Sequence, residues 1–383
     1  MCNLRRLWPF YRIVSRIRAG IAAFACVVVV AAPAQADQLR LGTTTAATPI
    51  SASRGWVVWS APAGADWQLM AWHDGVARAL ALAPRPAPFD ADVGTDARGR
   101  AVVTFSRCTR TPSGIGGTGS PAAGWTGRGC RVRVVDLVSG RERAAGIPRS
   151  RGDSDTSPSM WRGRVAFARH APGHRDVEQV LIFDPKQHRV VTLPHGAVPT
   201  SCPFREGCKG QPVHAGVTDL DLGARLVAFR WWVEAPAVVG HGGWEIRADV
   251  LRDRRSVLLG SGFAGEACTG GVDSSMPGAP TTDGLDVWWQ QTSTACEKTR
   301  ADLRRWNVAT GGLVSGSLPE TVIGLAYDAG ALLGIVAPPP APTPGVYSPV
   351  DFTCSAPGAP CQIERLDPPA LQRLDEQPQS PFF

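Results

Sequence analysis

Apolar residues in this chain occur in short runs that are separated by clusters of glycine, proline and charged residues. The run Val102-Val103-Thr104-Phe105 follows the polar turn Asp96-Ala-Arg-Gly99, and similar runs recur along the chain. β-Branched and aromatic residues favour strands, whereas Gly, Pro and Asp favour turns. After residue 36, no long segment has the i, i+3, i+4, i+7 apolar spacing of an amphipathic helix. The pattern therefore predicts an all-β protein.

The turn and the strand that follows it recur six times. The copies stand 44 to 64 residues apart when they are aligned on the turn glycines Gly55, Gly99, Gly163, Gly223, Gly284 and Gly330. Each copy has an expected partner strand before it, and each of the first five has two more strands after it. Repeats of this length and strand content indicate a ring of four-stranded antiparallel units. We therefore predict a six-bladed β-propeller over residues 37–370.

The N-terminal strand is expected to close this ring. The sixth unit lacks one strand after residues 361–366, and residues 38–41 have no partner in the first unit. Because closure removes an exposed sheet edge, we predict that 38–41 forms the outer strand of the sixth blade. We expect residues 278–281 to form the inner strand of the fifth blade and residues 371–383 to form a loose tail.

Residues 1–36 have the features of a secretory signal peptide. Five arginines precede a short apolar run at 19–32, and Ala34-Gln35-Ala36 places small residues before a cleavage site. The apolar run is shorter than the roughly 20 residues of a membrane-spanning helix, although an uncleaved anchor remains an alternative. We expect a protein that is secreted or located in the cell envelope, with no membrane span after the signal is removed.

The basic character of the full chain comes mostly from this signal. The sequence has 40 Lys and Arg against 33 Asp and Glu, and removal of the five signal arginines leaves 35 against 33. No Lys/Arg run of the kind that binds nucleic acid remains. We therefore expect a monomer that does not bind nucleic acid and whose partner is a protein or an envelope glycan.

Eight cysteines remain after signal removal, and an even number in an exported chain indicates disulfides. Their order suggests the sequential pairs Cys108–Cys130, Cys202–Cys208, Cys268–Cys296 and Cys354–Cys361. Zinc is the alternative, but zinc ligands usually come in C-x₂₋₄-C pairs, and Cys202 and Cys208 are separated by five residues. We expect disulfides and no bound metal at these cysteines.

The repeat resembles a known group of proteins. An Asp- or Arg-Gly turn precedes Val-x-Phe or Val-x-Trp, and a strand pair joined by a Gly turn follows, as in Asp136-Leu-Val-Ser-Gly140 and Asn307-Val-Ala-Thr-Gly311. This is similar to the TolB-type and WD-like propeller repeat, and to uncharacterised secreted propeller proteins of GC-rich bacteria. The resemblance covers residues 38–366 and implies the fold. Propellers have many functions, so it does not imply an activity.

Candidate ligand-binding residues lie on the expected inner strands. Asp90 and Asp92 belong to the strand expected at 89–93, and Asp219 and Asp221 belong to the one expected at 217–221 in the fourth unit. Such carboxylates could hold Ca²⁺ at a propeller channel, or could bond to nearby N–H groups and fix the hairpin. Trp125 lies in an inserted loop and could contact a ligand.

Other motifs give no catalytic assignment. The glycine motif at 114–119 matches G-x-G-x-x-G but is flanked by prolines, which favours a loop over a dinucleotide site. His170 and His174 are separated by a Pro-Gly pair and so cannot share a helix face. No G-x-S-x-G or H-E-x-x-H motif occurs. We therefore assign no catalytic residue.

Taken together, these features predict an exported, non-catalytic binding or interaction propeller. Inserted loops in units two to five are expected to form its recognition face. The alternative is an extracellular propeller hydrolase or lyase that acts on a sugar or lactone, with Ca²⁺ as a candidate cofactor. A purely structural envelope protein is a third interpretation.

Overall fold

The computed structural model describes residues 40–45, 48–109, 128–170, 178–193, 215–234, 242–264, 274–295, 298–319, 321–338, 354 and 360–374. These residues belong to one compact unit, Gln38–Phe383. They form strands and turns, and this described part contains no helix, so it also contains no helix that could cross a membrane. The all-β prediction is confirmed. The expected signal peptide lies outside the described residues.

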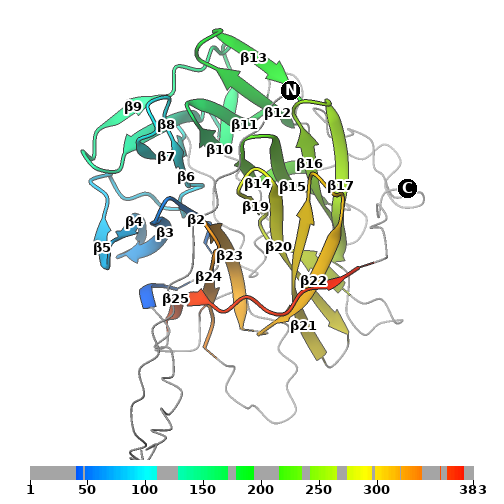
Figure 1. The fold of residues 1–383 in the computed structure, drawn as a ribbon. Coiled ribbons are helices and arrows are strands. Elements are labelled where there is room, and N and C mark those ends of the chain that lie inside the picture. Colours follow the sequence, from blue (N-terminus) through cyan, green and yellow to red (C-terminus); the bar gives the residue numbers. More distant parts are fainter. Residues whose placement is uncertain are drawn as a thin grey trace, which may run out of the picture. The chain divides into compact units, whose positions relative to one another are not determined.

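The strands form six antiparallel four-stranded blades, as predicted (Figure 1). Blade 1 contains β2 (Ile50–Ser53), β3 (Trp56–Ala63), β4 (Asp66–His73) and β5 (Val76–Ala79). Blade 2 contains β6 (Asp92–Thr95), β7 (Ala101–Arg107), β8 (Arg131–Asp136) and β9 (Glu142–Ala144). Blade 3 contains β10 (Ser154–Trp161), β11 (Arg164–His170), β12 (Glu178–Asp184) and β13 (Arg189–Thr192).

The second half of the ring follows the same plan. Blade 4 contains β14 (Ala215–Leu222), β15 (Leu226–Glu234), β16 (Gly242–Val250) and β17 (Arg255–Ala264). Blade 5 contains β19 (Thr281–Thr282), β20 (Asp286–Ala295), β21 (Lys298–Asn307) and β22 (Leu313–Leu318). Blade 6 contains β23 (Val322–Asp328), β24 (Ala331–Val336), β25 (Cys361–Leu366) and β1 (Arg40–Thr44). Two short strands, β18 (Ser274–Pro277) and β26 (Gln372–Arg373), pair at the edges of the fifth blade.

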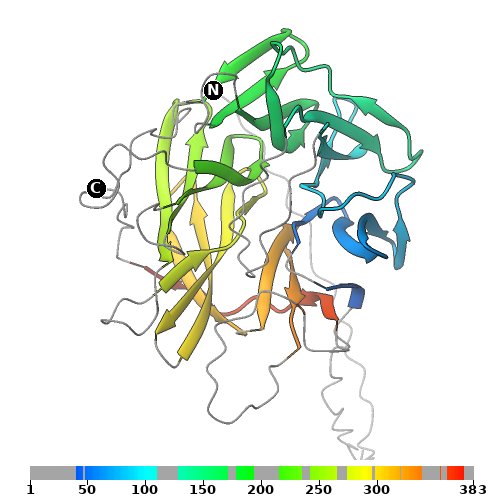
Figure 2. The same cartoon turned by 180° about the vertical axis from the view of Figure 1, so that it is seen from behind.

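The N-terminal strand closes the ring, as the sequence predicted. β1 pairs antiparallel with β25, with Thr44 opposite Cys361. A disulfide joins Cys354 to Cys361, and the Cys354 backbone N–H donates to the Thr45 carbonyl at 3.2 Å. Near the other terminus, β26 pairs with β22 (Figure 2). Pairing therefore reaches Arg373, inside the segment 371–383 that was expected to be a tail, and residues 375–383 lie outside the described part.

The inner strand of the fifth blade is shorter than predicted. Only Thr281 and Thr282 of this region pair with β20, and Gly278 makes a single backbone hydrogen bond to the Gln290 carbonyl at 2.7 Å. Pro280 has no N–H to donate to a ladder, which explains why 278–280 does not join the strand.

The core consists of six hydrophobic clusters, each located between two neighbouring blades. Successive side chains of one strand pack into different clusters. Val102 packs toward blade 3 and Val103 toward blade 1, while Trp288 packs toward blade 6 and Trp289 toward blade 4. Since side chains alternate between the two faces of a strand, burial of both faces requires continuous apolar runs. This requirement explains the sequence pattern.

The ring has two faces that differ in their connections. The turns from the first to the second strand and from the third to the fourth strand of each blade lie on one face, which we call the turn face. Its first turn in blade 2 has Gly99 at φ 78° and a carboxylate of Asp96 that accepts the N–H groups of Arg98 and Arg100 at 2.9 Å. Burial opposes ionisation of Asp96, but these bonds and the Arg100 guanidinium outweigh it and lower its pKa. The expected insertions lie outside the described residues, and the strand ends that flank them belong to the opposite face.

Candidate functional site

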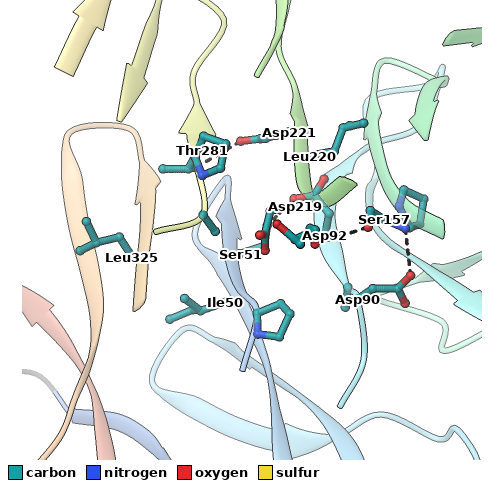
Figure 3. Close-up of a pocket in the computed structure, with 16 residues that line it drawn as sticks. Ile50, Ser51, Asp90, Asp92, Ser157, Asp219, Leu220, Asp221, Thr281 and Leu325 are labelled. Carbon is teal, nitrogen blue, oxygen red and sulfur yellow. Dashed lines mark hydrogen bonds between the residues drawn. The ribbon is translucent and has the colours of Figure 1, made fainter. Parts of the chain in front are cut away.

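A narrow channel of about 50 Å³ lies where the inner strands of the six blades converge. Its lining includes residues from every blade, namely Ser51, Asp90, Asp92, Ser157, Asp219, Asp221, Thr281 and Leu325 among others (Figure 3). The structure thus brings together the four aspartates that were predicted from two separate repeats. Their surroundings divide them into two kinds.

Asp90 links three parts of the fold. Its carboxylate accepts the Ser157 N–H of blade 3 at 3.0 Å, the Ser106 N–H at 3.0 Å and the Ser106 hydroxyl at 2.5 Å. Arg85 also contacts it at 3.3 Å, and both side chains are largely buried. These donors account for both carboxylate oxygens, so Asp90 stabilises the contact between blades 2 and 3.

Asp219 is held by an arginine in a similar way. The Arg230 guanidinium contacts its Oδ2 through Nη2 at 2.5 Å and through Nε at 2.8 Å. Arg230 is itself buried, donates to the Pro277 carbonyl at 2.7 Å, and lies 5.0 Å from the centroid of the Trp244 ring. The pair connects blade 4 to the segment that enters blade 5.

Asp92 and Asp221 are bonded by hydroxyl groups instead of arginines. The Ser51 hydroxyl donates to Asp92 Oδ1 at 2.6 Å and accepts the Val93 N–H at 3.0 Å. In blade 3, the Ser159 hydroxyl donates to Asp221 Oδ1 at 3.3 Å and accepts a backbone N–H of blade 4 at 2.8 Å. The same serine–aspartate contact therefore joins blade 1 to blade 2 and blade 3 to blade 4.

Neither of these two carboxylates forms an ion pair within the described part of the chain. Burial, followed by the nearby charge of Asp221, raises the pKa of Asp92 well above its usual value. Burial also raises the pKa of Asp221 to about 6, although hydrogen bonds from Thr282, Thr281 and Ser159 oppose the shift. Both acids line the same narrow channel, where burial makes their ionised forms less favourable than in water.

A larger cavity of about 510 Å³ opens on the turn face, and we call it the funnel. Asp221 lines both the funnel and the channel, so the channel is the narrow continuation of the funnel. The funnel wall is made by the first turns of the blades and includes Arg54, Trp161, Arg162, Asp283, Tyr327 and Asp328. Its volume falls within the range of about 300–1,000 Å³ that is typical of ligand sites.

Several polar groups of the funnel wall are engaged in holding the blades together. Asp328 of blade 6 accepts the Arg54 and Gly55 N–H groups of blade 1 at 2.8 and 2.6 Å. The Arg54 guanidinium donates to the Gly99 carbonyl of blade 2 at 2.6 Å. Tyr327 stacks on Trp288 with a centroid distance of 4.7 Å. The wall is thus fixed in shape by contacts between blades.

The sequence did not predict the funnel, because it is formed by turns from all parts of the chain. The sequence did contain one indication of the funnel wall. The residues next to the aligned turn glycines include an aromatic residue and several arginines, and a comparison of those positions across the repeats would have identified Trp161 and Arg162.

Glu178 is another polar residue that the sequence analysis missed. It starts β12, where its Cα lies opposite that of His170, and its Oε2 accepts the Val217 N–H of blade 4 at 2.8 Å. Burial raises its pKa to about 7, and the Val217 bond only partly opposes this shift. It belongs to the opposite face and is not among the described residues that line the channel or the funnel.

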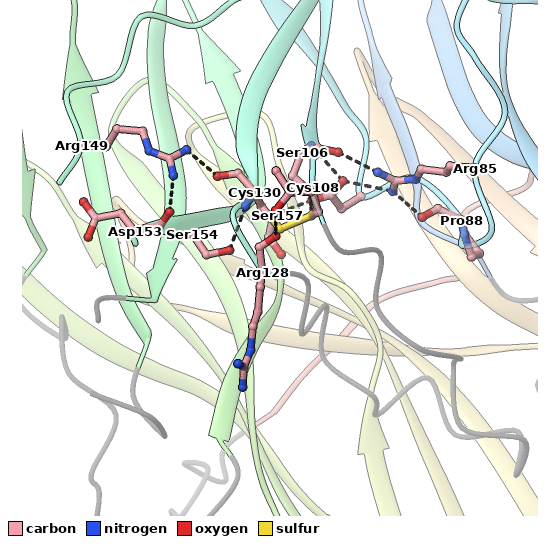
Figure 4. The surroundings of a disulfide bond; sticks show 12 residues. Arg85, Pro88, Ser106, Cys108, Arg128, Cys130, Arg149, Asp153, Ser154 and Ser157 are labelled. Carbon is pink, nitrogen blue, oxygen red and sulfur yellow. Dashed lines mark hydrogen bonds and ion pairs between the residues drawn. A yellow bond between two sulfur atoms is a disulfide. The ribbon is translucent and has the colours of Figure 1, made fainter. Parts of the chain in front are cut away.

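Two of the four predicted disulfides fall among the described residues, and both are present: Cys108–Cys130 and Cys354–Cys361. The first joins the end of β7 to the start of β8, where the Cys130 N–H donates to the Ser154 hydroxyl at 3.1 Å and Arg149 donates to the Cys130 carbonyl at 2.9 Å (Figure 4). Cys202, Cys208, Cys268 and Cys296 lie outside the described residues. Trp125, His174 and the 114–119 glycine motif do so as well. Within the described ranges, no group of three or more His, Cys, Asp or Glu side chains could hold a metal ion.

No protein-family model matches this sequence, and no curated protein is similar to it. Solved structures resemble it at low similarity. A protein from Lactobacillus plantarum has 11% identity and a TM-score of 0.39, covering 78% of this chain and 80% of its own. An oligogalacturonate lyase from Vibrio parahaemolyticus has 8% identity and a TM-score of 0.40, covering 79% and 75%. A prolyl endopeptidase has 10% identity and a TM-score of 0.36, covering 78% of this chain and 46% of its own. We draw nothing about activity from these likenesses.

Proposed function

We propose that this chain is an exported binding protein that takes its ligand in the funnel and does not catalyse a reaction. The observation that carries the proposal is the contrast between the two connected cavities. The funnel has about 510 Å³ and an aromatic and polar wall, whereas the channel has about 50 Å³. A ligand-sized group fits the first and not the second.

The state of the channel aspartates supports a structural role for them. Asp90 and Asp219 are neutralised by Arg85 and Arg230, and Asp92 and Asp221 accept hydrogen bonds from neighbouring blades. No histidine is among the described residues that line the channel or the funnel. These contacts stabilise the ring and leave recognition to the turn-face surface.

Export and family resemblance belong to the same proposal. The predicted signal peptide and the two disulfides favour an extracytoplasmic location, because disulfides persist in oxidising compartments. The TolB-type repeat resemblance fits a binding propeller whose partner is a protein or an envelope glycan. The six blades supply a rigid frame, which keeps a preformed site open at small entropic cost.

An extracellular hydrolase or lyase that acts on a sugar or lactone is the second candidate. The observation in its favour is the pair Asp92 and Asp221, whose raised pKa values resemble those of catalytic carboxylates. The narrowness of the channel counts against it. Activity that is abolished by Asp92→Asn, or by a Ca²⁺ chelator, would favour the enzyme.

A binding experiment tests the proposal. The mature chain is screened against envelope fractions and an oligosaccharide panel, and bound material is measured again with Trp161→Leu. Trp67→Leu is the matched control, since Trp67 is also half-buried but is the second residue of β4, at the end of the strand that belongs to the opposite face. We expect the Trp161 variant to lose at least tenfold in affinity and the control to bind like the wild type. Equal loss in both variants, or unchanged binding in both, would overturn the proposal.

A further inference from the structure

Positive charge is concentrated on one half of the turn face. The turns of blades 2, 3 and 4 and the adjoining strand ends carry ten exposed cationic side chains that form no ion pair within the described residues: Arg98, Arg141, Arg143, Arg162, Lys186, Arg189, Arg225, Arg252, Arg254 and Arg255. Two acidic residues of these turns, Asp184 and Asp253, form no ion pair with an arginine of the described part of the chain. The turns of blades 5, 6 and 1 carry Asp283, Asp328 and Asp74 together with Arg54, so they are of mixed charge. The face therefore has a basic half, formed by blades 2 to 4, and a half of mixed charge.

A groove crosses the basic half. A cavity of about 380 Å³ lies between blades 2 and 3, with Arg98 and Arg143 on its blade 2 side and Pro185 on its blade 3 side. Ala97 and Met160 line both this cavity and the funnel. The two spaces therefore lie next to each other, and we call the cavity between blades 2 and 3, together with its border on the funnel, the groove.

Trp161 lines the funnel and follows Met160, which borders both the groove and the funnel. It is half-buried, and the Arg162 and Arg164 guanidinium groups lie 4.8 and 5.5 Å from its ring centroid. An indole in such a wall offers an apolar surface against which a flat, partly apolar ring can pack. The guanidinium groups of arginines near this ring are planar forks that match carboxylate and sulfate groups in a bidentate manner.

We propose that this groove binds a linear acidic polysaccharide. Carboxylate or sulfate groups of successive sugars would pair with Arg98, Arg143 and Arg162, and one sugar ring would pack on Trp161. The inference rests on the proposed function, because it assigns a ligand class to the same funnel. The mixed charge of the turns of blades 5, 6 and 1 makes them less favourable for an anionic chain than the basic half.

The shape of the surface favours a polymer chain over an anionic membrane. A lipid surface is flat and is usually met by a projecting apolar cluster beside the basic residues. The large apolar side chains exposed in the described part are Val76, Val138 and Leu285, and they belong to three different blades. Arg98 and Arg143, by contrast, line a concave groove.

The test uses defined oligosaccharides and the mature chain. Binding of an alginate hexamer and a heparin hexasaccharide is measured by calorimetry at low and at moderate salt, with neutral maltohexaose as the uncharged probe. The variant is Arg98→Ala combined with Arg143→Ala. Arg131→Ala is the matched control, because Arg131 is exposed and lies at the opposite end of the same blade. Thermal unfolding checks that every variant is folded.

We expect the acidic probes to bind, to weaken as salt rises, and to lose at least tenfold in affinity in the double variant only. Equal affinity for maltohexaose, an unchanged affinity of the double variant, or binding to anionic vesicles but to neither acidic probe would overturn the inference. If maltohexaose binds and Trp161→Leu abolishes that binding, the ligand class is wrong while the proposed funnel function stands. If Trp161→Leu changes the binding of no ligand, charged or neutral, both the ligand class and the proposed funnel function are wrong.

Discussion

Replacement of Glu178 by Gln should stabilise the protein at neutral pH. The folded state raises the pKa of this carboxyl from 4.5 to about 7, with burial as the main cause. Between these two values the folded chain binds more protons than the unfolded chain, so the free energy of unfolding falls as pH rises. At about 1.4 kcal/mol per pKa unit, the free energy of unfolding falls by about 3 kcal/mol in total across this pH range. Gln does not titrate, and its carbonyl can still accept the Val217 N–H.

Urea unfolding at pH 4.5 and at pH 8 measures this effect. We expect the variant to match the wild type within about 0.5 kcal/mol at pH 4.5 and to be about 1–3 kcal/mol more stable at pH 8. Glu142→Gln is the control. The Glu142 carboxylate forms ion pairs with Arg133 at 2.6 Å and with Arg107 at 2.8 Å, so its neutralisation does not stabilise the folded state. A Glu178 variant that is less stable than the wild type at pH 8 would refute the reasoning.

Three further predictions concern the ring itself. Gly94→Ala should destabilise the fold by several kcal/mol, since a Cβ there would lie 1.6 Å from a backbone oxygen of the next blade; Gly216→Ala, whose Cβ meets only ordinary contacts, is the control in thermal unfolding. Replacement of Cys354 and Cys361 by serine should cost about 2–3 kcal/mol in the entropic model, as measured by denaturant unfolding without reductant; no change would mean that the closing blade does not depend on this bond. Asp90→Asn should cost about 2–4 kcal/mol because it leaves donors unpaired, yet leave ligand affinity unchanged; a stable variant that loses binding would contradict the structural role of this residue.

The fold could be predicted because each blade repeats the same local pattern. Adjacent apolar residues such as Val102 and Val103 are needed wherever both faces of a strand are buried, and the turn at Asp96–Gly99 is defined by neighbours in sequence. Ring closure was predictable too, because a strand without a partner and a blade that lacks a strand are both visible in the sequence.

The roles of the channel aspartates could not be predicted in the same way. Asp90 and Asp219 look alike in the sequence, as do Asp92 and Asp221. Their partners come from other blades, as with Ser157 N–H on Asp90 and the Ser159 hydroxyl on Asp221. Local sequence carries no record of which donors the ring places opposite a side chain.

The funnel escaped prediction for a related reason. Its wall combines turn residues from blades that lie far apart in the chain, such as Arg54 and Tyr327. Each of these turns is ordinary by itself, and only their convergence makes a ligand-sized space. The inserted loops of units two to five that were predicted to form the recognition face lie outside the described residues, and their role remains a prediction.

Hydrogen–deuterium exchange with and without the alginate hexamer tests the central claim most directly, because it reports where on the ring the ligand binds. The account predicts slower exchange in peptides that contain the turns at 54–55, 97–100 and 161–164. Slower exchange confined to strand ends of the opposite face, at 106–108 and 130–131, would contradict it.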